Sequence, residues 1–146
     1  MYKGVYCLVF KNAECFITIG ALGEYHFSRG WYCYVGSALG PGGFTRVRRH
    51  WFLHKNHDKV PSWHVDYLLL NPDFHLSYII CGRTSQKKEC SLARVIDRTS
   101  IEGFGASDCS CISHLFYRPS NPLKELKSAF QSIGLTPINK KIINDW

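Results

Sequence analysis

The chain lacks any apolar run long enough to cross a lipid bilayer, so a membrane-spanning protein is not expected. Residues 1–10 hold one short apolar run, without the charged start and the cleavage site of a secretory signal peptide. Internal repeats and low-complexity segments are missing as well. From these absences we predict a cytoplasmic protein with no membrane partner.

An even, regularly spaced set of cysteines is also missing, because the chain has seven. Small secreted domains that are held together by disulfides normally use an even number. Together with the lack of an export signal, the odd count favours reduced thiols in a cytoplasm. We therefore expect most cysteines to pack in or near the core, namely Cys7, Cys15, Cys33, Cys81 and Cys90.

The residues that are abundant point to a folded domain with an acidic partner. The hydrophobic share is 45%, with Phe 9, Tyr 8 and Trp 4, which predicts a packed core rather than disorder. A length of 146 residues predicts one domain. The net charge of +7 fits a polyanionic partner.

Hydrophobic periodicity and turn residues predict an α+β fold, in which a small antiparallel or mixed central sheet is flanked by helices. The first two strands are expected to pair as a hairpin. We predict one domain over residues 1–118 and expect a C-terminal helix and tail, residues 119–146, to pack on it. The third helix is expected to turn Leu92, Val95 and Ile96 inward. The expected strands cover residues 4–10, 14–20, 25–27, 31–36 and 74–81, with an ambiguous segment at 109–117, and the expected helices cover residues 45–56, 63–70, 87–97 and 123–133.

The most informative stretch runs from Tyr34 to His50. A strand end is followed there by a glycine-rich loop and by a basic helix, for which Thr45 is the expected N-cap. Loop glycines let backbone N–H groups approach a ligand, and a helix N-terminus carries partial positive charge. Arg46 and His50 are four residues apart in the sequence and therefore project from one helix face. This layout predicts a site for an anion such as phosphate.

Motifs in and around this stretch resemble the signature of the GIY-YIG nucleases, namely Gly4-Val5-Tyr6, Tyr34-Val35-Gly36 and the spacing Arg46-x-x-x-His50. Glu89, at the start of the third expected helix, matches the position of that family's metal-binding glutamate. Three longer blocks are similar to an offshoot of the superfamily that occurs alone or fused to endonuclease III, namely residues 63–68, 89–93 and 103–116. The resemblance covers residues 4–117.

Two features depart from the usual pattern of that family. The stretch from Tyr6 to Tyr34 is far longer than in typical members, and we expect it to hold an inserted hairpin around residues 13–30. Residues 107–109 (Ser-Asp-Cys) stand where typical members carry an asparagine. Both departures bear on how a substrate is held.

The resemblance implies a role for each motif residue. Glu89 would hold Mg²⁺ or Mn²⁺ through one carboxylate and several waters. Arg46 would clamp the scissile phosphate, because guanidinium geometry matches phosphate oxygens. Tyr6 or Tyr34 would activate water with the help of nearby cations, since a free phenol has a pKa of about 10, and His50 would relay a proton or bind phosphate.

Each of these residues also has a plainer interpretation. A glutamate in the first turn of a helix is favoured by the helix dipole, whatever else it does. A tyrosine in a strand is most often a core residue with a satisfied hydroxyl. An arginine on a basic helix is commonly a solvated side chain.

The resemblance further implies a nucleic-acid partner, with DNA favoured over RNA. The leading prediction is a metal-dependent endonuclease that hydrolyses phosphodiester bonds. The alternative is a nucleic-acid-binding module on a nuclease-like fold that does not cleave. In either case, the residues expected to contact nucleic acid are Gly36, Ser37, Arg48, Arg49 and His64.

A separate cluster suggests a structural metal site instead. Cys109, Cys111 and His114 offer thiolate and imidazole ligands that suit Zn²⁺, which prefers four. Their spacing is shorter than the usual one for zinc, so packed thiols and a hydrogen-bonded histidine are the favoured interpretation. A zinc-bound cluster would instead predict a structural or interaction protein. A further interpretation brings four polar residues together at the active face, namely His64, Asp66, Asp108 and His114.

Overall fold

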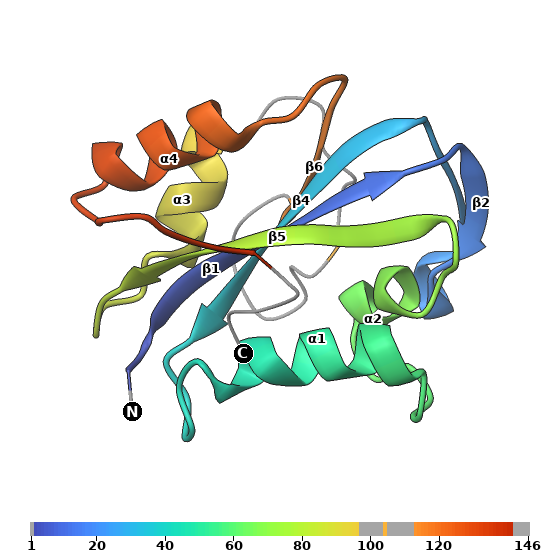
Figure 1. Ribbon diagram of the computed structural model, residues 1–146, viewed down its shortest axis with the longest axis horizontal. Coiled ribbons are helices and arrows are strands. Elements are labelled where there is room, and N and C mark those ends of the chain that lie inside the picture. The colour runs from blue at the N-terminus through green and yellow to red at the C-terminus, as the bar shows by residue number, and fades with distance from the viewer. Residues whose placement is uncertain (1, 97–103, 105–112, 142–146) are drawn as a thin grey trace.

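The computed structural model describes residues 2–96, 104 and 113–141, and Figure 1 shows a sheet between two pairs of helices. The five-stranded sheet consists of β1 (Gly4–Asn12), β4 (Gly30–Ala38), β5 (Phe74–Arg83), β6 (Leu115–Arg118) and β7 (Ile138–Lys141). The helices are α1 (Thr45–Asn56), α2 (His64–Leu69), α3 (Glu89–Ile96) and α4 (Leu123–Ser132). A second sheet pairs β2 (Cys15–Thr18) with β3 (Glu24–Phe27), which are joined by a 3₁₀ turn at Gly20–Leu22. The predicted α+β class and its C-terminal helix are confirmed.

Strand β1 is the central strand of the main sheet. The strand order is β6-β4-β1-β5-β7, and every neighbouring pair is antiparallel. Successive side chains of a strand point to opposite faces, so β1 contributes to two core layers. One layer contains Tyr6, Leu8 and Phe10 together with residues of α1 and α2. The other layer contains Val5, Cys7 and Val9 together with residues of α3 and α4.

The predicted pairing of the first two strands is wrong. Strand β1 pairs with β4 and β5, whereas β2 pairs with β3 in the small sheet. Only one residue of β1 is exposed, and a strand that is buried on both faces takes a central place with a neighbour on each side. The insertion expected around residues 13–30 does form a hairpin, made of β2 and β3.

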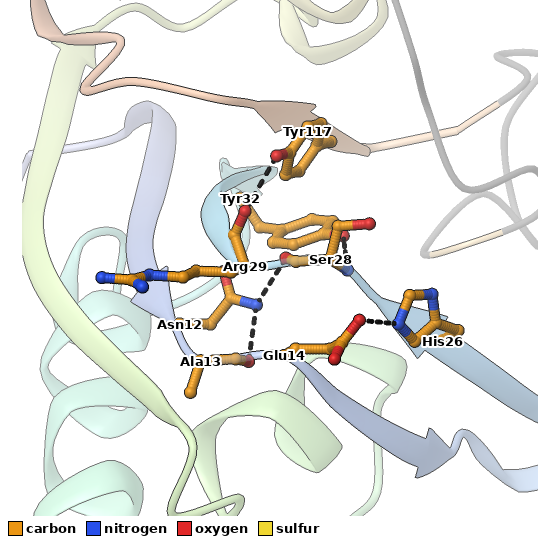
Figure 2. Close-up of polar contacts among 8 residues, drawn as sticks. All are labelled: Asn12, Ala13, Glu14, His26, Ser28, Arg29, Tyr32 and Tyr117. Atoms are coloured by element: carbon orange, nitrogen blue, oxygen red, sulfur yellow. Dashed lines mark hydrogen bonds and ion pairs between the residues drawn. The ribbon is translucent and has the colours of Figure 1, made fainter.

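Figure 2 shows how this hairpin is tied to the main sheet at its base. The Asn12 amide nitrogen donates to the carbonyl oxygens of Ala13 and Ser28, at 3.1 and 2.9 Å. From the neighbouring strand β6, the Tyr117 hydroxyl donates to the Arg29 carbonyl at 2.8 Å. Both ends of the hairpin are therefore fixed next to Asn12, the last residue of β1.

Helix α1 has the predicted bounds but not the predicted cap. The N-cap position is Phe44, and no side chain bonds there. The Thr45 hydroxyl donates to the Gly42 carbonyl at 2.8 Å, so the threonine begins the helix instead of capping it. Gly42 and Gly43 have φ angles of 87° and 52°, which favour glycine, and this explains why the loop before α1 is rich in it.

Two features of the C-terminal half differ from prediction. Val95 is 46% exposed, whereas Ala93 is buried, so the inward side of α3 consists of Leu92, Ala93 and Ile96. Strand β7 was not predicted, because its sequence Ile-Asn-Lys-Lys has no apolar alternation. It is an edge strand that pairs with β5 alone.

The cysteines follow the expectation only in part. Cys7, Cys33 and Cys81 are buried free thiols, and Cys15 is a half-buried free thiol. Cys90 is disulfide-bonded, which contradicts the expectation of reduced thiols throughout. Within the described ranges, every helix is too short or too polar to cross a membrane.

Candidate active site

A buried pair, Tyr6 and His50, lies at the centre of the predicted site. The Tyr6 hydroxyl and the His50 Nε2 are 2.8 Å apart, and the two residues are 1% and 2% exposed. Tyr6 reaches His50 because alternation along β1 directs its side chain toward α1. Arg46 and His50 both contact Trp63, as their predicted placement on one helix face requires, but His50 is buried while Arg46 is half-exposed.

Burial sets the protonation of both partners. Desolvation raises the pKa of Tyr6 well above its usual value. Desolvation, with the charges of Arg49 and Arg46, lowers the pKa of His50 to about 3. At neutral pH the pair is therefore a phenol and a neutral imidazole. The phenol donates to Nε2 when the ring proton of His50 is on Nδ1.

Gly36 makes room for the Tyr6 ring. Gly36 on β4 lies directly opposite Tyr6 on β1. A Cβ at this position would overlap the ring carbons and the hydroxyl of Tyr6. The sequence predicts Gly36 as a contact to nucleic acid, which stays a prediction. Its observed function is to leave space across the strands for the tyrosine of the other motif.

The Tyr34 side chain lies on the same sheet face as Tyr6. Tyr34 pairs with Leu8, two residues along β1 from Tyr6, and such diagonal neighbours are within reach of aromatic side chains. Tyr34 is only half-buried, and its ring contacts Phe104 with centroids 6.1 Å apart. Of the two predicted tyrosines, Tyr34 is therefore the one that solvent reaches.

Arg46 is held by two contacts. Its Nη1 donates to the Ser37 carbonyl at 2.8 Å, while contact of Ser37 with nucleic acid stays a prediction. Its guanidinium also lies over the Trp63 ring, 4.9 Å from the centroid. These contacts fix the arginine next to the end of β4 and leave its remaining N–H donors for an anion.

Trp63 also belongs to the site, although no role was predicted for it from the sequence. Arg49 lies over the same indole at 4.4 Å, and the His50 ring meets it edge-on with centroids 5.7 Å apart. The Trp63 backbone N–H donates to the Asp66 carboxylate at 3.0 Å, which caps α2. Trp63 is the first residue of the block 63–68, which resembles the nuclease offshoot, but only the fold shows that its indole contacts α1.

Glu89 approaches the pair from the other side of the sheet. It is the first residue of α3, and its side chain is 27% exposed. Its Oε2 lies 3.8 Å from Nδ1 of His114, a buried residue whose carbonyl accepts from the Val35 N–H at 2.8 Å. The charges of Tyr34 and Glu89 raise the pKa of Tyr6, whereas Arg46 and Arg49 lower it. Tyr34, Arg46 and Glu89 thus influence the pKa of Tyr6, and His50 is its hydrogen-bond partner.

The carboxylate of Glu89 fits a hydrated divalent ion. Mg²⁺ is commonly bound through one or two carboxylates and keeps several waters. Among the described residues, no group of three or more His, Cys, Asp or Glu side chains forms a metal cluster. The predicted zinc ligands Cys109 and Cys111 lie outside the described residues. His114 contacts Glu89, and its Nε2 is 3.9 Å from the Cys90 sulfur.

The remaining predicted residues surround this centre unevenly. His64 packs on Phe104, with centroids 5.5 Å apart, and burial lowers its pKa. Arg48 is exposed and lies over Phe52 instead of Trp63. Asp66 accepts hydrogen bonds from the Ser62 and Trp63 N–H groups and caps α2. Asp108 lies outside the described residues, so the suggested cluster of His64, Asp66, Asp108 and His114 stays a prediction.

A cavity of about 300 Å³ adjoins the outer side of the pair. It lies between α1 and the segment that leads to α2, and His50 is part of its lining. Polar and charged side chains surround it, namely Arg49, Asp58, Lys59, Ser62 and Asp66. Three apolar side chains, Phe52, Leu53 and Val60, complete its lining.

Comparison with known proteins gives one match. A sequence profile described as "Domain of unknown function DUF123" matches residues 5–135. No curated protein and no solved structure matches the chain.

Proposed function

The chain belongs to the DUF123 family, and we propose that it is a metal-dependent endonuclease that hydrolyses phosphodiester bonds in DNA or RNA. The proposed mechanism is that of the GIY-YIG nucleases, which its motifs resemble. The observation that carries the proposal is the shared environment of Tyr6, Tyr34, Arg46 and Glu89 around a buried tyrosine–histidine bond. These residues come from β1, β4, α1 and α3, so only the fold brings them together.

Arg46 is the phosphate ligand in this proposal. Its position is fixed from two sides, by the Ser37 carbonyl and by the Trp63 ring. A guanidinium that is fixed before the substrate arrives loses little further freedom on binding, which favours a defined phosphate orientation. Arg49, stacked on the same indole, adds positive charge to this side of the site. A divalent ion bound at Glu89 would neutralise charge on the phosphate and assist the leaving oxygen.

Tyr34 and the Tyr6–His50 pair activate the water. Tyr34 is the half-exposed phenol, whereas Tyr6 is buried behind it. A tyrosinate at Tyr6 is disfavoured in the free protein, because burial raises its pKa. Tyr6 and His50 both stay neutral only if three transfers are coupled: Tyr6 accepts a proton that comes from the attacking water by way of Tyr34, passes its own proton to the His50 Nε2, and His50 gives up its Nδ1 proton. The cavity beside His50 supplies the polar space for that proton.

The test is cleavage of a panel of structured DNAs and RNAs with Mg²⁺ or Mn²⁺. We expect Glu89→Gln to lower the cleavage rate by roughly 10²-fold or more, because its neutral amide is a poor ligand for these ions. The matched control is Glu14→Gln, which removes a carboxylate on the hairpin that is 67% exposed and paired with His26. This control should cleave like the wild type.

Two results would contradict the proposal. Equal cleavage by wild type and Glu89→Gln would show that the assigned metal site is wrong. Salt-sensitive binding of nucleic acid without cleavage by the wild type would instead favour a binding module on a nuclease-like fold. The burial of Tyr6 is the observation that makes this second outcome worth testing.

A further inference from the structure

A groove of about 480 Å³ lies on the other flank of α1. Arg48, in its lining, is two residues from both Arg46 and His50, so it projects from a different side of the helix. The groove is bounded by the residues before β1, the first turn of α1, the end of β5 and the edge strand β7. Its lining includes Tyr2, Phe44, Arg48, Arg83, Ile138 and Lys140.

The charges in this groove are all of one sign. Three of the lining residues are cations, Arg48, Arg83 and Lys140, and none is acidic. The ion pairs found within residues 2–96, 104 and 113–141 involve neither arginine. Arg48 and Arg83 are both exposed. A concave surface with two exposed arginines attracts anions, and the two guanidinium groups match phosphate oxygens.

An aromatic platform lies beside these cations. The Arg83 guanidinium is stacked on the Tyr2 ring at 3.2 Å from its centroid. Tyr2 is nevertheless 65% exposed, so the ring is open to a further planar group. Phe44 and Ile138 add apolar surface to the same groove. A flat aromatic ring next to phosphate-binding cations is the arrangement that binds unpaired bases by stacking.

We propose that this groove binds an unpaired nucleotide of a single-stranded nucleic acid, with the base stacked on Tyr2 and the phosphate held by Arg48 and Arg83. A paired base is already stacked within its duplex, so a double strand offers only phosphates to the groove. This inference rests on the proposed function, because the groove would hold the part of the strand that lies beside the cleaved bond. Arg46 and Arg48 project from different sides of one helix turn, so the strand would contact both by passing over the N-terminal end of α1. The preferred substrate then carries an unpaired stretch beside the cleaved bond.

Binding of a fluorescent oligothymidylate, measured by anisotropy in EDTA, tests the groove without cleavage. We expect Tyr2→Ala to weaken binding about tenfold, through lost base stacking, and Tyr2→Phe to retain it. We expect Arg83→Gln to reduce the slope of log K against log salt by about 0.7, the value for one lost phosphate contact on a single strand. The matched controls are Phe16→Ala, whose side chain is likewise 65% exposed, and Arg29→Gln, an exposed arginine on the hairpin.

A blunt duplex provides the comparison that defines the ligand. Its affinity should change less than twofold on Tyr2→Ala, because its bases are not available for stacking. An equal loss for duplex and single strand would overturn the proposal, and so would unchanged binding of the single strand by Tyr2→Ala and Arg83→Gln. The two proposals fail separately. Groove-dependent binding without cleavage refutes only the nuclease, whereas Glu89-dependent cleavage with groove-independent binding refutes only the groove.

Discussion

The buried imidazole of His50 makes the stability of the protein depend on pH in a way that one substitution removes. The folded-state pKa of His50 is about 3, against about 6.5 for a free histidine. The unfolded chain therefore binds a proton at this residue over a range where the folded chain does not. Stability rises with pH wherever the unfolded state holds more protons, so this contribution is present above about 6.5 and is lost as the pH falls toward about 3.

The magnitude follows from the size of this window. One proton contributes about 1.4 kcal/mol per pH unit, so a fall from pH 7 to 5 removes about 2 kcal/mol of unfolding free energy through His50. His50→Gln keeps a polar partner for the Tyr6 hydroxyl but cannot titrate. Its unfolding free energy should therefore depend less on pH by that amount. Other groups that titrate in this range are common to both proteins and cancel in the difference.

Urea unfolding of wild type and His50→Gln at pH 5, 6 and 7 measures this difference. His75→Gln, which removes an exposed histidine, is the control and should follow the wild type. If wild type and His50→Gln lose the same free energy between pH 7 and 5, His50 is not held neutral by burial. The buried Tyr6–His50 pair could then not act as described.

Two further predictions concern the residues that support this pair. Gly36→Ala should destabilise the protein by about 1–3 kcal/mol in urea unfolding, because the added methyl group overlaps the Tyr6 ring. The smaller side chain of Tyr6→Leu should relieve part of that cost in the double variant, and an additive loss would contradict the overlap. Asp66→Ala should cost about 1–2 kcal/mol, since the Ser62 and Trp63 N–H groups lose their acceptor, and Asp66→Asn should cost less.

The elements that are predicted best from the sequence are those whose ends are determined by neighbouring residues. Helix α1 matches its predicted range of residues 45–56, because the preceding loop contains glycines at positive φ. Helix α4 also lies within its predicted range and is followed by Gly134 at a φ of 82°. Turn and helix-end preferences depend on a few neighbouring residues, and for that reason periodicity and glycine positions suffice to locate them.

The pairing of strands was harder to predict from the sequence, because it depends on residues that are far apart in the chain. Strand β1 was correctly expected, but its partners β4 and β5 begin 18 and 62 residues after its own end at Asn12. Strand β7 has two lysines and no alternating pattern, so only its hydrogen bonds to β5 reveal it. The same limit applies to Trp63. Its contacts to Arg46 and Arg49 cross between helices, and no local pattern indicates them.

The long insertion between the two tyrosine motifs raises the question of whether it obstructs the site. The answer lies in the register of β1 and β4. The hairpin leaves the sheet where Asn12 pairs with Gly30, whereas Tyr6 pairs with Gly36, six residues further along both strands. At about 3.3 Å per residue this separation is roughly 20 Å. The bonds of Asn12 and Tyr117 fix the hairpin base at that distant end. The insertion therefore lengthens the chain between the motifs while the cross-strand contact of Tyr6 with Gly36 is kept, and the base of the hairpin is fixed at the end of the sheet away from Tyr6.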